Sequence, residues 1–345
     1  MRKGTVIFIF LLLGVLLFIF TLRKVGVNAV KDAVFMFSFF QFSLILLMLT
    51  LGLILMGSFR WRVIMKGIGA PVPSFGKLFL VKLVGFSLSY ITPSALFGGE
   101  PARFYILKQE DEKINSKLIA SIIVDKLMQT LSSCFFFFAG IFLLLFYLDL
   151  SWLNDILMML VLLFVILFFI FLIKRVKKVS KEKGFFVSML RVLYLDKIKK
   201  INDMQDRFEE VEQEIRQFFR QPKSFVFKTI LYTVFEVIFV LIVFWLIVFF
   251  MGNVLTIPRV LVIRSMTDLS SIIPFPASLG TLEMTQAFVF EIFGLGAYTG
   301  VALSLIFRAV SLVLAFIGLV IFMFFHIRGI VDKLGKKILK IIPKR

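Results

Sequence analysis

The stretch "SYITPSALFGGEPARFY", from Ser89 to Tyr105, interrupts a chain that is otherwise rich in leucine, phenylalanine, isoleucine and valine. Proline and glycine break helices, and a carboxylate, Glu100, follows this break directly. A second stretch, "SSIIPFPASLGTLEMTQ" from Ser270 to Gln286, repeats the order of proline, small residues, glycine and glutamate. Two loops between helices are one interpretation of the pattern. A pair of broken helices that form a binding site inside a bilayer is the other.

The composition around these stretches is that of a membrane protein. Of 345 residues 60% are hydrophobic, and 46 are phenylalanine, whereas a soluble domain is about 45–50% apolar. Apolar runs that reach about 18 residues, enough to cross the hydrocarbon core, occur several times. The runs do not alternate apolar and polar residues as the strands of a membrane barrel do. The sequence therefore predicts an all-α polytopic membrane protein.

The net charge of +19 concentrates at the ends of the apolar runs. Examples are "FRWRVIMK" after Met56, "KRVKKVSKEK" after Ile173 and the C-terminal "RGIVDKLGKKILKIIPKR". Positive charge next to a span faces the cytoplasm and anionic lipid headgroups. Because no soluble basic module with interleaved aromatics is visible, we expect lipid partners and no nucleic acid.

The chain has one cysteine, Cys134, and one histidine, His326. An internal disulfide is therefore impossible. A metal centre with His or Cys ligands, or a Ser-His or Cys-His catalytic pair, has almost no candidate residues. No P-loop motif occurs. We expect no catalytic residues, no metal and no cofactor, and hence a protein that is not an enzyme.

The order of apolar and polar segments predicts about six full transmembrane helices plus two broken re-entrant hairpins. The full spans are Gly4–Leu22, Ala33–Met56, Leu118–Leu148, Leu153–Ile173, Ser224–Phe250 and Ala297–Phe325. The predicted parts are a first membrane half, 1–173, with re-entrant segment 74–108; a basic cytoplasmic linker with an amphipathic helix, 174–223; a second half, 224–325, with re-entrant segment 255–293; and a basic cytoplasmic tail, 326–345.

The linker and the tail carry the basic load, so both termini are expected in the cytoplasm of a cell-membrane protein. Counting spans then makes the first broken segment enter from the cytoplasm and the second from the opposite side. Each break is followed about 30 residues later by charge in a long span, Asp125 and Lys126 in the first half and Arg308 in the second. Inverted repeats with interrupted segments are typical of alternating-access transporters.

At these residues the sequence resembles the flippase-like family, the membrane domain of lysylphosphatidylglycerol synthases (multiple peptide resistance factors). The paired signatures that carry the resemblance are Pro93, Gly98, Gly99, Glu100 and Arg103, then Pro274, Gly280, Glu283 and Arg308. The resemblance covers nearly the whole chain. It implies movement of a phospholipid with a modified headgroup, such as an aminoacyl-phosphatidylglycerol, or of a lipid-linked headgroup between leaflets.

Three departures from the family pattern stand out. A Glu-Arg pair in the long third span reads Asp125-Lys126, and the second motif has one glycine, Gly280, where relatives often have several. The soluble aminoacyl-transferring domain is expected to be absent, because about twenty residues follow the last predicted span. Two other functions stay open: a membrane subunit that acts with a separate lysyltransferase, and a carrier of soluble solutes. A homo-oligomer stays open as well.

The charged residues near the breaks have two interpretations each. Pro101 favours a helix start after Glu100, whose free N–H groups suit a phosphate. Arg103 lies on the same face and can bind a phosphodiester or clamp Glu100. Glu283 corresponds to Glu100. Arg308 and Glu236 stand nearly alone in apolar spans, so each serves a substrate or an ion pair between helices.

Two further groups complete the candidate site. Asp125 and Gln129 share a helical face, with Lys126 about a quarter-turn away, and Arg264 and Asp268 at i,i+4 can neutralise each other. We expect substrate contacts from Glu100, Arg103, Asp125, Lys126, Asp268, Glu283 and Arg308. In this hypothesis the hairpins meet near the bilayer midplane, with a headgroup between Arg103 and Arg308.

Overall fold

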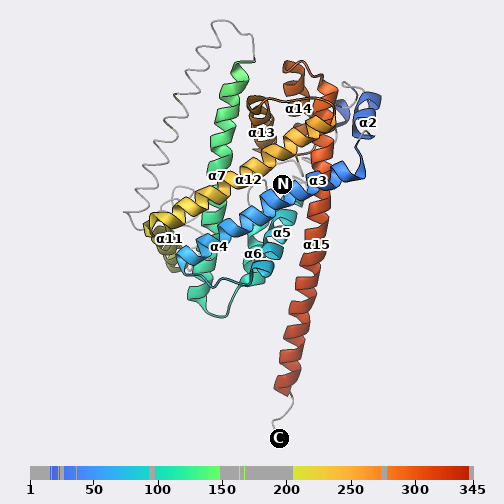
Figure 1. The fold of residues 1–345 in the computed structure, drawn as a ribbon. Coiled ribbons are helices and arrows are strands. Elements are labelled where there is room, and N and C mark those ends of the chain that lie inside the picture. Colours follow the sequence, from blue (N-terminus) through green and yellow to red (C-terminus); the bar gives the residue numbers. More distant parts are fainter. Residues whose placement is uncertain are drawn as a thin grey trace.

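A computed structural model of the chain describes residues 27–35, 37–92, 98–147, 205–272 and 278–341, together with residues 16, 18–21, 23, 163 and 167. The side chains of 326–341 are outside this description. All regular elements in the described ranges are helices (Figure 1). They are α2 (Val27–Phe35), α3 (Phe39–Leu49), η1 (Thr50–Met56), α4 (Gly57–Ile68), α5 (Phe75–Ile91), α6 (Glu100–Leu107), α7 (Glu112–Leu145), α11 (Gln205–Arg220), α12 (Lys223–Phe250), α13 (Ile257–Ile272), α14 (Thr281–Ile292) and α15 (Ala297–Ile341).

Four of the described helices are long and apolar enough to cross a membrane. Their spans are Phe39–Ile68, Glu112–Leu145, Lys223–Phe250 and Ala297–Phe325. The predicted spans Gly4–Leu22 and Leu153–Ile173 lie almost wholly outside the described residues. Many large apolar side chains on the four spans are exposed, among them Phe135, Phe235 and Phe316. This is the surface expected of helices whose outer faces contact lipid.

The second predicted span is longer than the sequence indicated. It continues past Met56 to Ile68, through the basic segment that was expected to face lipid headgroups. That expectation is wrong for Arg60, which is 0% exposed. The Arg60 side chain can lie in the interior because it forms ion pairs there with Asp125 and Glu236.

The middle of this helix, η1, is a π-helix of seven residues. A π-helical stretch holds more residues per turn than an α-helix and often marks a functional site. Gly52 lies inside it, and an added Cβ would stand 2.7 Å from the Cβ of Phe239 on α12. The π-helical stretch therefore lies against α12 and sets the rotation at which α4 begins.

The long helices α7 and α15 run in opposite chain directions, each packed against a shorter helix of the other half of the chain (Figure 1). Helix α13 packs along α7, and α5 packs along α15. At each crossing a glycine of the long helix meets a serine of the shorter one, Gly140 with Ser265 and Gly318 with Ser87. Small residues let membrane helices approach closely.

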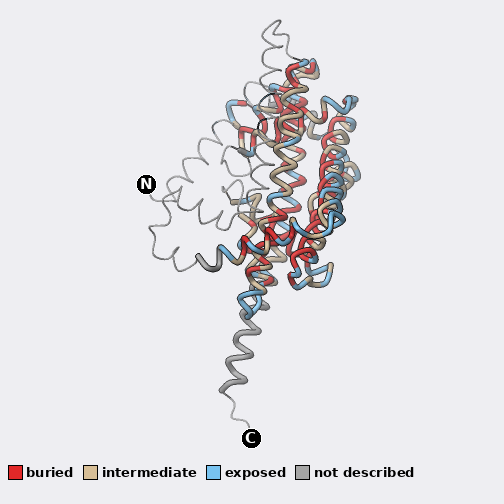
Figure 2. Tube along the Cα trace, turned by 90° about the vertical axis from the view of Figure 1, so that its left-hand side faces the viewer, coloured by how far each residue is buried: buried red, intermediate tan, exposed pale blue. Residues whose placement is uncertain are grey.

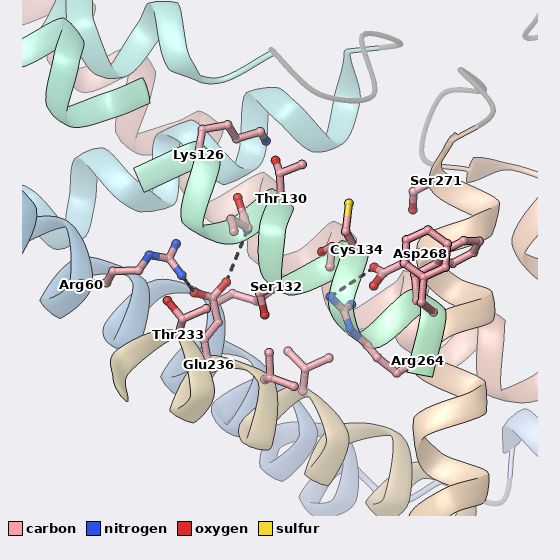
Figure 3. Close-up of a pocket in the computed structure, with 17 residues that line it drawn as sticks. Arg60, Lys126, Thr130, Ser132, Cys134, Thr233, Glu236, Arg264, Asp268 and Ser271 are labelled. Carbon is pink, nitrogen blue, oxygen red and sulfur yellow. Dashed lines mark hydrogen bonds and ion pairs between the residues drawn. The ribbon is translucent and has the colours of Figure 1, made fainter. Parts of the chain in front are cut away.

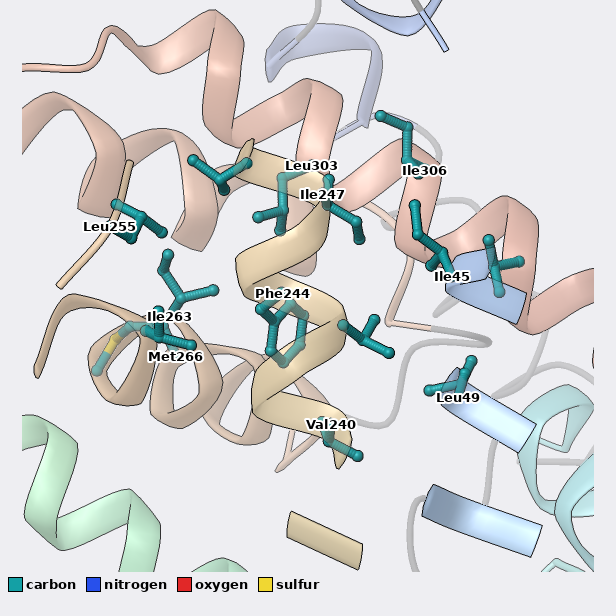
Figure 4. Packing of buried hydrophobic residues seen from close by; sticks show 14 of the residues in the cluster. Ile45, Leu49, Val240, Phe244, Ile247, Leu255, Ile263, Met266, Leu303 and Ile306 are labelled. Carbon is teal, nitrogen blue, oxygen red and sulfur yellow. The ribbon is translucent and has the colours of Figure 1, made fainter. Parts of the chain in front are cut away.

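The largest apolar cluster joins α12 to α3, α13, α14 and α15 (Figure 4). Phe244 and Ile247 of α12 are 0% exposed and pack with Ile263, Leu303 and Ile306. Buried residues follow the facing sides of the helices, with exposed residues outside (Figure 2). Helix α12 thus forms the centre of the apolar packing.

A glycine is required at each break, for a close backbone contact at the first and for a left-handed backbone conformation at the second. The backbone of Gly99 lies against that of Gly85 in α5, so that any Cβ would overlap the Gly85 backbone. In the second break Gly280 has φ 79°, a left-handed conformation that favours glycine, directly before α14. Pro93 and Pro274, the prolines predicted to break the helices, lie outside the described residues.

Helix α11 lies in the later part of the segment 174–223. Its apolar residues Val211, Ile215 and Phe218 are buried against α4 and α7, while residues such as Gln213 are exposed. The ring of Phe218 fits over Gly67 of α4. The apolar face of α11 therefore covers one end of α4 and α7.

Candidate functional site

Asp125 of α7 is the centre of a buried ion-pair cluster. Its Oδ1 accepts from Arg60 Nε at 2.8 Å, and its Oδ2 accepts from Lys82 Nζ at 2.6 Å and Arg103 Nη2 at 2.9 Å. The three cations come from α4, α5 and α6. One carboxylate thus joins four helices in an apolar interior, where each charge needs such a partner.

A second carboxylate extends the cluster to α12. Glu236 accepts a hydrogen bond from Arg60 Nη1, and Gln129 Nε2 donates to Glu236 Oε1 at 3.4 Å. With each group in its ordinary ionised form, the three cations and two carboxylates leave one net positive charge. A buried positive charge is a place for an anion, because it lowers the cost of taking the anion out of water.

Arg103 is positioned by packing as well as by charge. Its guanidinium lies 3.8 Å from the centre of the Trp61 ring, and Trp61 Nε1 donates to Ser121 at 3.1 Å. The absence of a side chain at Gly85 leaves room for the Arg103 methylenes. The predicted clamp between Arg103 and Glu100 is not observed. Arg103 reaches Asp125, and Lys126 Nζ pairs with Glu100 Oε1 at 3.2 Å.

The second break carries its own ion pair. Arg308 Nη2 lies 2.6 Å from Glu283 Oε1 and 3.3 Å from the carbonyl oxygen of Ser278. Glu283 Oε2 accepts from the backbone N–H of Gly280 at 2.8 Å, which caps the start of α14. Tyr90, at the end of α5, lies within electrostatic reach of Arg308 and Glu283. The end of α5, directly before the first break, therefore lies near the second ion pair.

A cavity of about 560 Å³ opens between α4, α7, α12 and α13 (Figure 3). Arg60 and Glu236 lie at one side, and Arg264 and Asp268, 3.1 Å apart, lie at the other. The wall between them is the polar face of α7, made of Lys126, Gln129, Thr130, Ser132, Ser133 and Cys134. A smaller cavity of about 50 Å³ adjoins it through Leu53, Lys126 and Gln129, and is lined by Lys82, Gly99 and Arg103.

Several buried polar atoms around the cavities have no hydrogen-bond partner within the protein. They are Arg60 Nη2, Arg103 Nε, Arg264 Nε, Glu100 Oε2 and Asp268 Oδ2, and near the second break Arg308 Nε. Unsatisfied buried donors cost free energy, so each is a position where a ligand or water gains by binding. Four of the six atoms are arginine donors, which suit oxygen atoms of an anion.

The seven residues predicted to contact substrate fall into three ion-pair groups. Arg103 and Asp125 lie in the first cluster with Lys126 and Glu100 beside it, Glu283 pairs with Arg308, and Asp268 pairs with Arg264. Sequence reasoning missed Arg60 and the role of Lys82. The sequence carries a signal for both residues, because each cation stands among apolar residues. A cation in such a place needs a buried partner.

Metal ligation has no support in the described part of the chain. Three or more His, Cys, Asp or Glu side chains do not gather there as metal ligands would. The carboxylates that face the cavities are instead each paired with a cation.

The helices and the ion-pair clusters define a multi-pass α-helical membrane protein with charged groups in its interior. Residues 7–318 match the family model described as the lysylphosphatidylglycerol synthase TM region, and the chain belongs to that family. The match bears out the resemblance seen at the two breaks.

Two curated relatives come from archaea. A UPF0104 membrane protein of Methanocaldococcus jannaschii is 27% identical over 288 residues, which cover 81% of this chain and 83% of the relative. A UPF0104 membrane protein of Methanothermobacter thermautotrophicus is 33% identical over 94 residues, 27% of each chain. No solved structure matches the chain significantly.

Proposed function

We propose that the protein is a lipid transporter of the cell membrane that moves a phospholipid with a modified headgroup, or a lipid-linked headgroup, between leaflets. The observation that carries the proposal is the net positive cluster around Asp125, with unpartnered arginine nitrogens, next to a cavity of about 560 Å³ whose lining is mostly apolar. The oxygen atoms of a phosphate that enters the cavity can replace their hydrogen bonds to water by hydrogen bonds from arginine. Its acyl chains can remain in hydrocarbon.

The proposal includes an inverted repeat of two halves. In each half the glutamate after the break pairs with a cation of the next long helix, Glu100 with Lys126 and Glu283 with Arg308. The paired residues are separated by nearly the same number of residues, 26 and 25. The glycine–serine crossings of α7 with α13 and of α15 with α5 add a second correspondence.

We further propose six full spans, two re-entrant segments and both termini in the cytoplasm, with the segment 174–223 as a cytoplasmic linker. The two re-entrant segments then enter the membrane from opposite sides, and α6 and α14 lie toward opposite ends of α7 (Figure 1). Such an arrangement supports access to one site from alternate sides. In the proposed cycle, Arg103 and Arg308 are the arginines that the phosphate contacts near the first and the second break.

Reconstituted vesicles test the transport activity. The purified protein is placed in vesicles with an aminoacyl-phosphatidylglycerol, phosphatidylglycerol or phosphatidylethanolamine that carries a fluorescent acyl chain, and dithionite bleaches the outer leaflet. We expect wild-type protein to raise the movement of at least one probe well above that in protein-free vesicles. If none of the three probes moves faster than in empty vesicles, the proposal is contradicted.

Charge-paired variants separate transport from folding. Arg308→Gln leaves Glu283 buried without its cation, so a loss of activity has two explanations. In Arg308→Gln with Glu283→Gln the pair is neutral, and we expect folded protein that no longer moves lipid. Lys228→Gln, an exposed cation on α12, is the matched control and should move lipid as the wild type does.

The native cysteine gives an independent measure of lipid entry. Cys134 lines the large cavity and is partly buried. We expect a small maleimide to modify it, and phosphatidylglycerol to slow the reaction in a dose-dependent way. An unchanged rate would place the bound lipid elsewhere.

A further inference from the structure

The carboxylate of Asp268 is held by a single cation. Arg264 lies one turn earlier on the same helix, with Nη2 3.1 Å from Asp268 Oδ1. Both side chains line the large cavity, and Asp268 Oδ2 is buried without a hydrogen-bond partner. Anything that draws Arg264 away therefore leaves this carboxylate without compensation.

The other buried carboxylates are more firmly held. Asp125 has three cations, Glu236 has Arg60 and Gln129, and Glu283 has both Arg308 and the N–H of Gly280. Glu100 also has one cation, Lys126, which lines both cavities, but the Glu100 carboxylate itself lines only the cavity of about 50 Å³. Among the described residues, Asp268 is thus the carboxylate of the large cavity whose partner an entering anion can take.

The charge balance of this pair leads to the inference, which rests on the proposed function. We propose that Asp268 takes up one proton from water when an anionic headgroup binds Arg264, so that lipid movement is coupled to proton movement. The empty pair is neutral. With a singly charged phosphate on Arg264 and the proton on Asp268 Oδ2, the loaded site is neutral again. Without the proton, loading adds a negative charge to a buried site.

The groups around Asp268 determine where the proton goes. Helix α7 contributes Lys126 and Cys134 to the cavity, α12 contributes Glu236, and α4 contributes Arg60. Glu236 keeps Arg60 and Gln129 when Arg264 is taken. No described side chain of α14 that can titrate lines the cavity. Asp268 is therefore the acceptor, and release of lipid on the other side returns the proton to water there.

A headgroup with its own ammonium neutralises the phosphate without a proton. The coupling should therefore hold for phosphatidylglycerol and be absent, or much weaker, for phosphatidylethanolamine and for aminoacyl-phosphatidylglycerols, whose amino groups are cationic. This difference between probes does not depend on any mutation, and it separates proton coupling from a general effect of pH on the protein.

The first experiment uses the wild-type protein in vesicles with a pH difference across the membrane. For one lipid anion moved with one proton, the phosphatidylglycerol probe should accumulate in the leaflet on the alkaline side, by about tenfold per pH unit at steady state. A potassium diffusion potential should leave the distribution unchanged, since the loaded site is neutral. A distribution that follows the potential and ignores the pH difference overturns the proposal.

The second experiment measures binding in detergent, where no transport is needed. If binding takes up a proton, the affinity for phosphatidylglycerol must rise as pH falls. The affinity should change by up to about tenfold per pH unit in the pH range in which Asp268 is ionised in the empty site and protonated in the loaded site. Asp268→Asn should flatten this slope, and Glu236→Gln should retain it. If Glu236→Gln removes the slope and Asp268→Asn keeps it, the proton is carried by Glu236 and the assignment is wrong.

The two proposals fail in different ways. If the probe moves but neither its distribution nor its binding depends on pH, the protein is a lipid transporter without proton coupling. If no probe moves but wild-type binding keeps its pH slope and Asp268→Asn loses it, the proton linkage stands and the transport function does not.

Discussion

Asp125 shows how a single residue organises the interior of this protein. Its two oxygens receive side chains from α4, α5 and α6 and tie them to α7. Removal of one partner from a buried ion pair costs about 3–5 kcal/mol, chiefly because the other charge is left uncompensated. Here one substitution leaves Lys82 and Arg103 without their carboxylate, while Arg60 keeps Glu236.

We expect Asp125→Asn to lower the free energy of unfolding by at least about 3 kcal/mol. Thermal unfolding in detergent, followed by intrinsic tryptophan fluorescence, measures the change. The control is Lys66→Gln, because Lys66 is exposed on α4 and should change stability by less than about 0.5 kcal/mol. A variant Asp125→Asn as stable as the control would mean that water already compensates these cations.

Two glycines of the first broken segment should respond in opposite ways to the same substitution. A Cβ at Gly99 overlaps the Gly85 backbone, whereas a Cβ at Gly76, exposed near the start of α5, meets no atom within 4 Å. Gly99→Ala should destabilise the protein by about 1–3 kcal/mol or more. Gly76→Ala should stabilise it by up to about 1 kcal/mol, since alanine favours a helix. The same unfolding measurement decides, and equal effects would contradict the close approach.

At the scale of the helices, the two crossings between halves depend on glycine–serine contacts. Gly140 leaves room for Ser265, whose Oγ donates to the carbonyl oxygen of Phe136 at 2.6 Å. We expect Gly140→Ala and Ser265→Gly each to be destabilising, and the double variant to lose less than their sum. Residues in contact couple by about 0.5–3 kcal/mol in such cycles. Gly318→Ala with Ser87→Gly repeats the test at the other crossing, and additive losses at both would refute the contacts.

The sequence predicted most helices from their apolar content, and it placed both breaks, because proline and glycine act locally. It could not predict which charges pair. Arg103 is three residues from Glu100 in sequence, yet its partner Asp125 is 22 residues away and that of Arg60 is 65 away. Pairings of this kind depend on how helices cross, and crossing depends on contacts such as Gly85 with Gly99 that no local pattern reveals.

For the whole molecule, the orientation in the membrane is the property that the basic segments predict. In the proposed orientation the positive charge of 174–223 keeps α11 in the cytoplasm, and α12 then carries the chain to the other side. After replacement of Cys134, we expect a cysteine at Gln217 to be shielded from an impermeant maleimide in intact cells and a cysteine at Val254 to react. Both positions are exposed in the structure. The reverse labelling pattern would invert the proposed topology.

The π-helical stretch η1 holds one residue more than an α-helix of the same rotation needs. A π-helix turns the chain less per residue than the about 100° of an α-helix, so the seven residues Thr50–Met56 turn it about as far as six α-helical residues would. Loss of one residue from this stretch should therefore leave Arg60 and Trp61 facing Asp125 and Arg103. Loss of one residue between Gly57 and Phe59, in the α-helical part, should instead turn both side chains away by about 100°. Relatives whose helix is one residue shorter within the stretch should thus keep the inward-facing cation at the equivalent position.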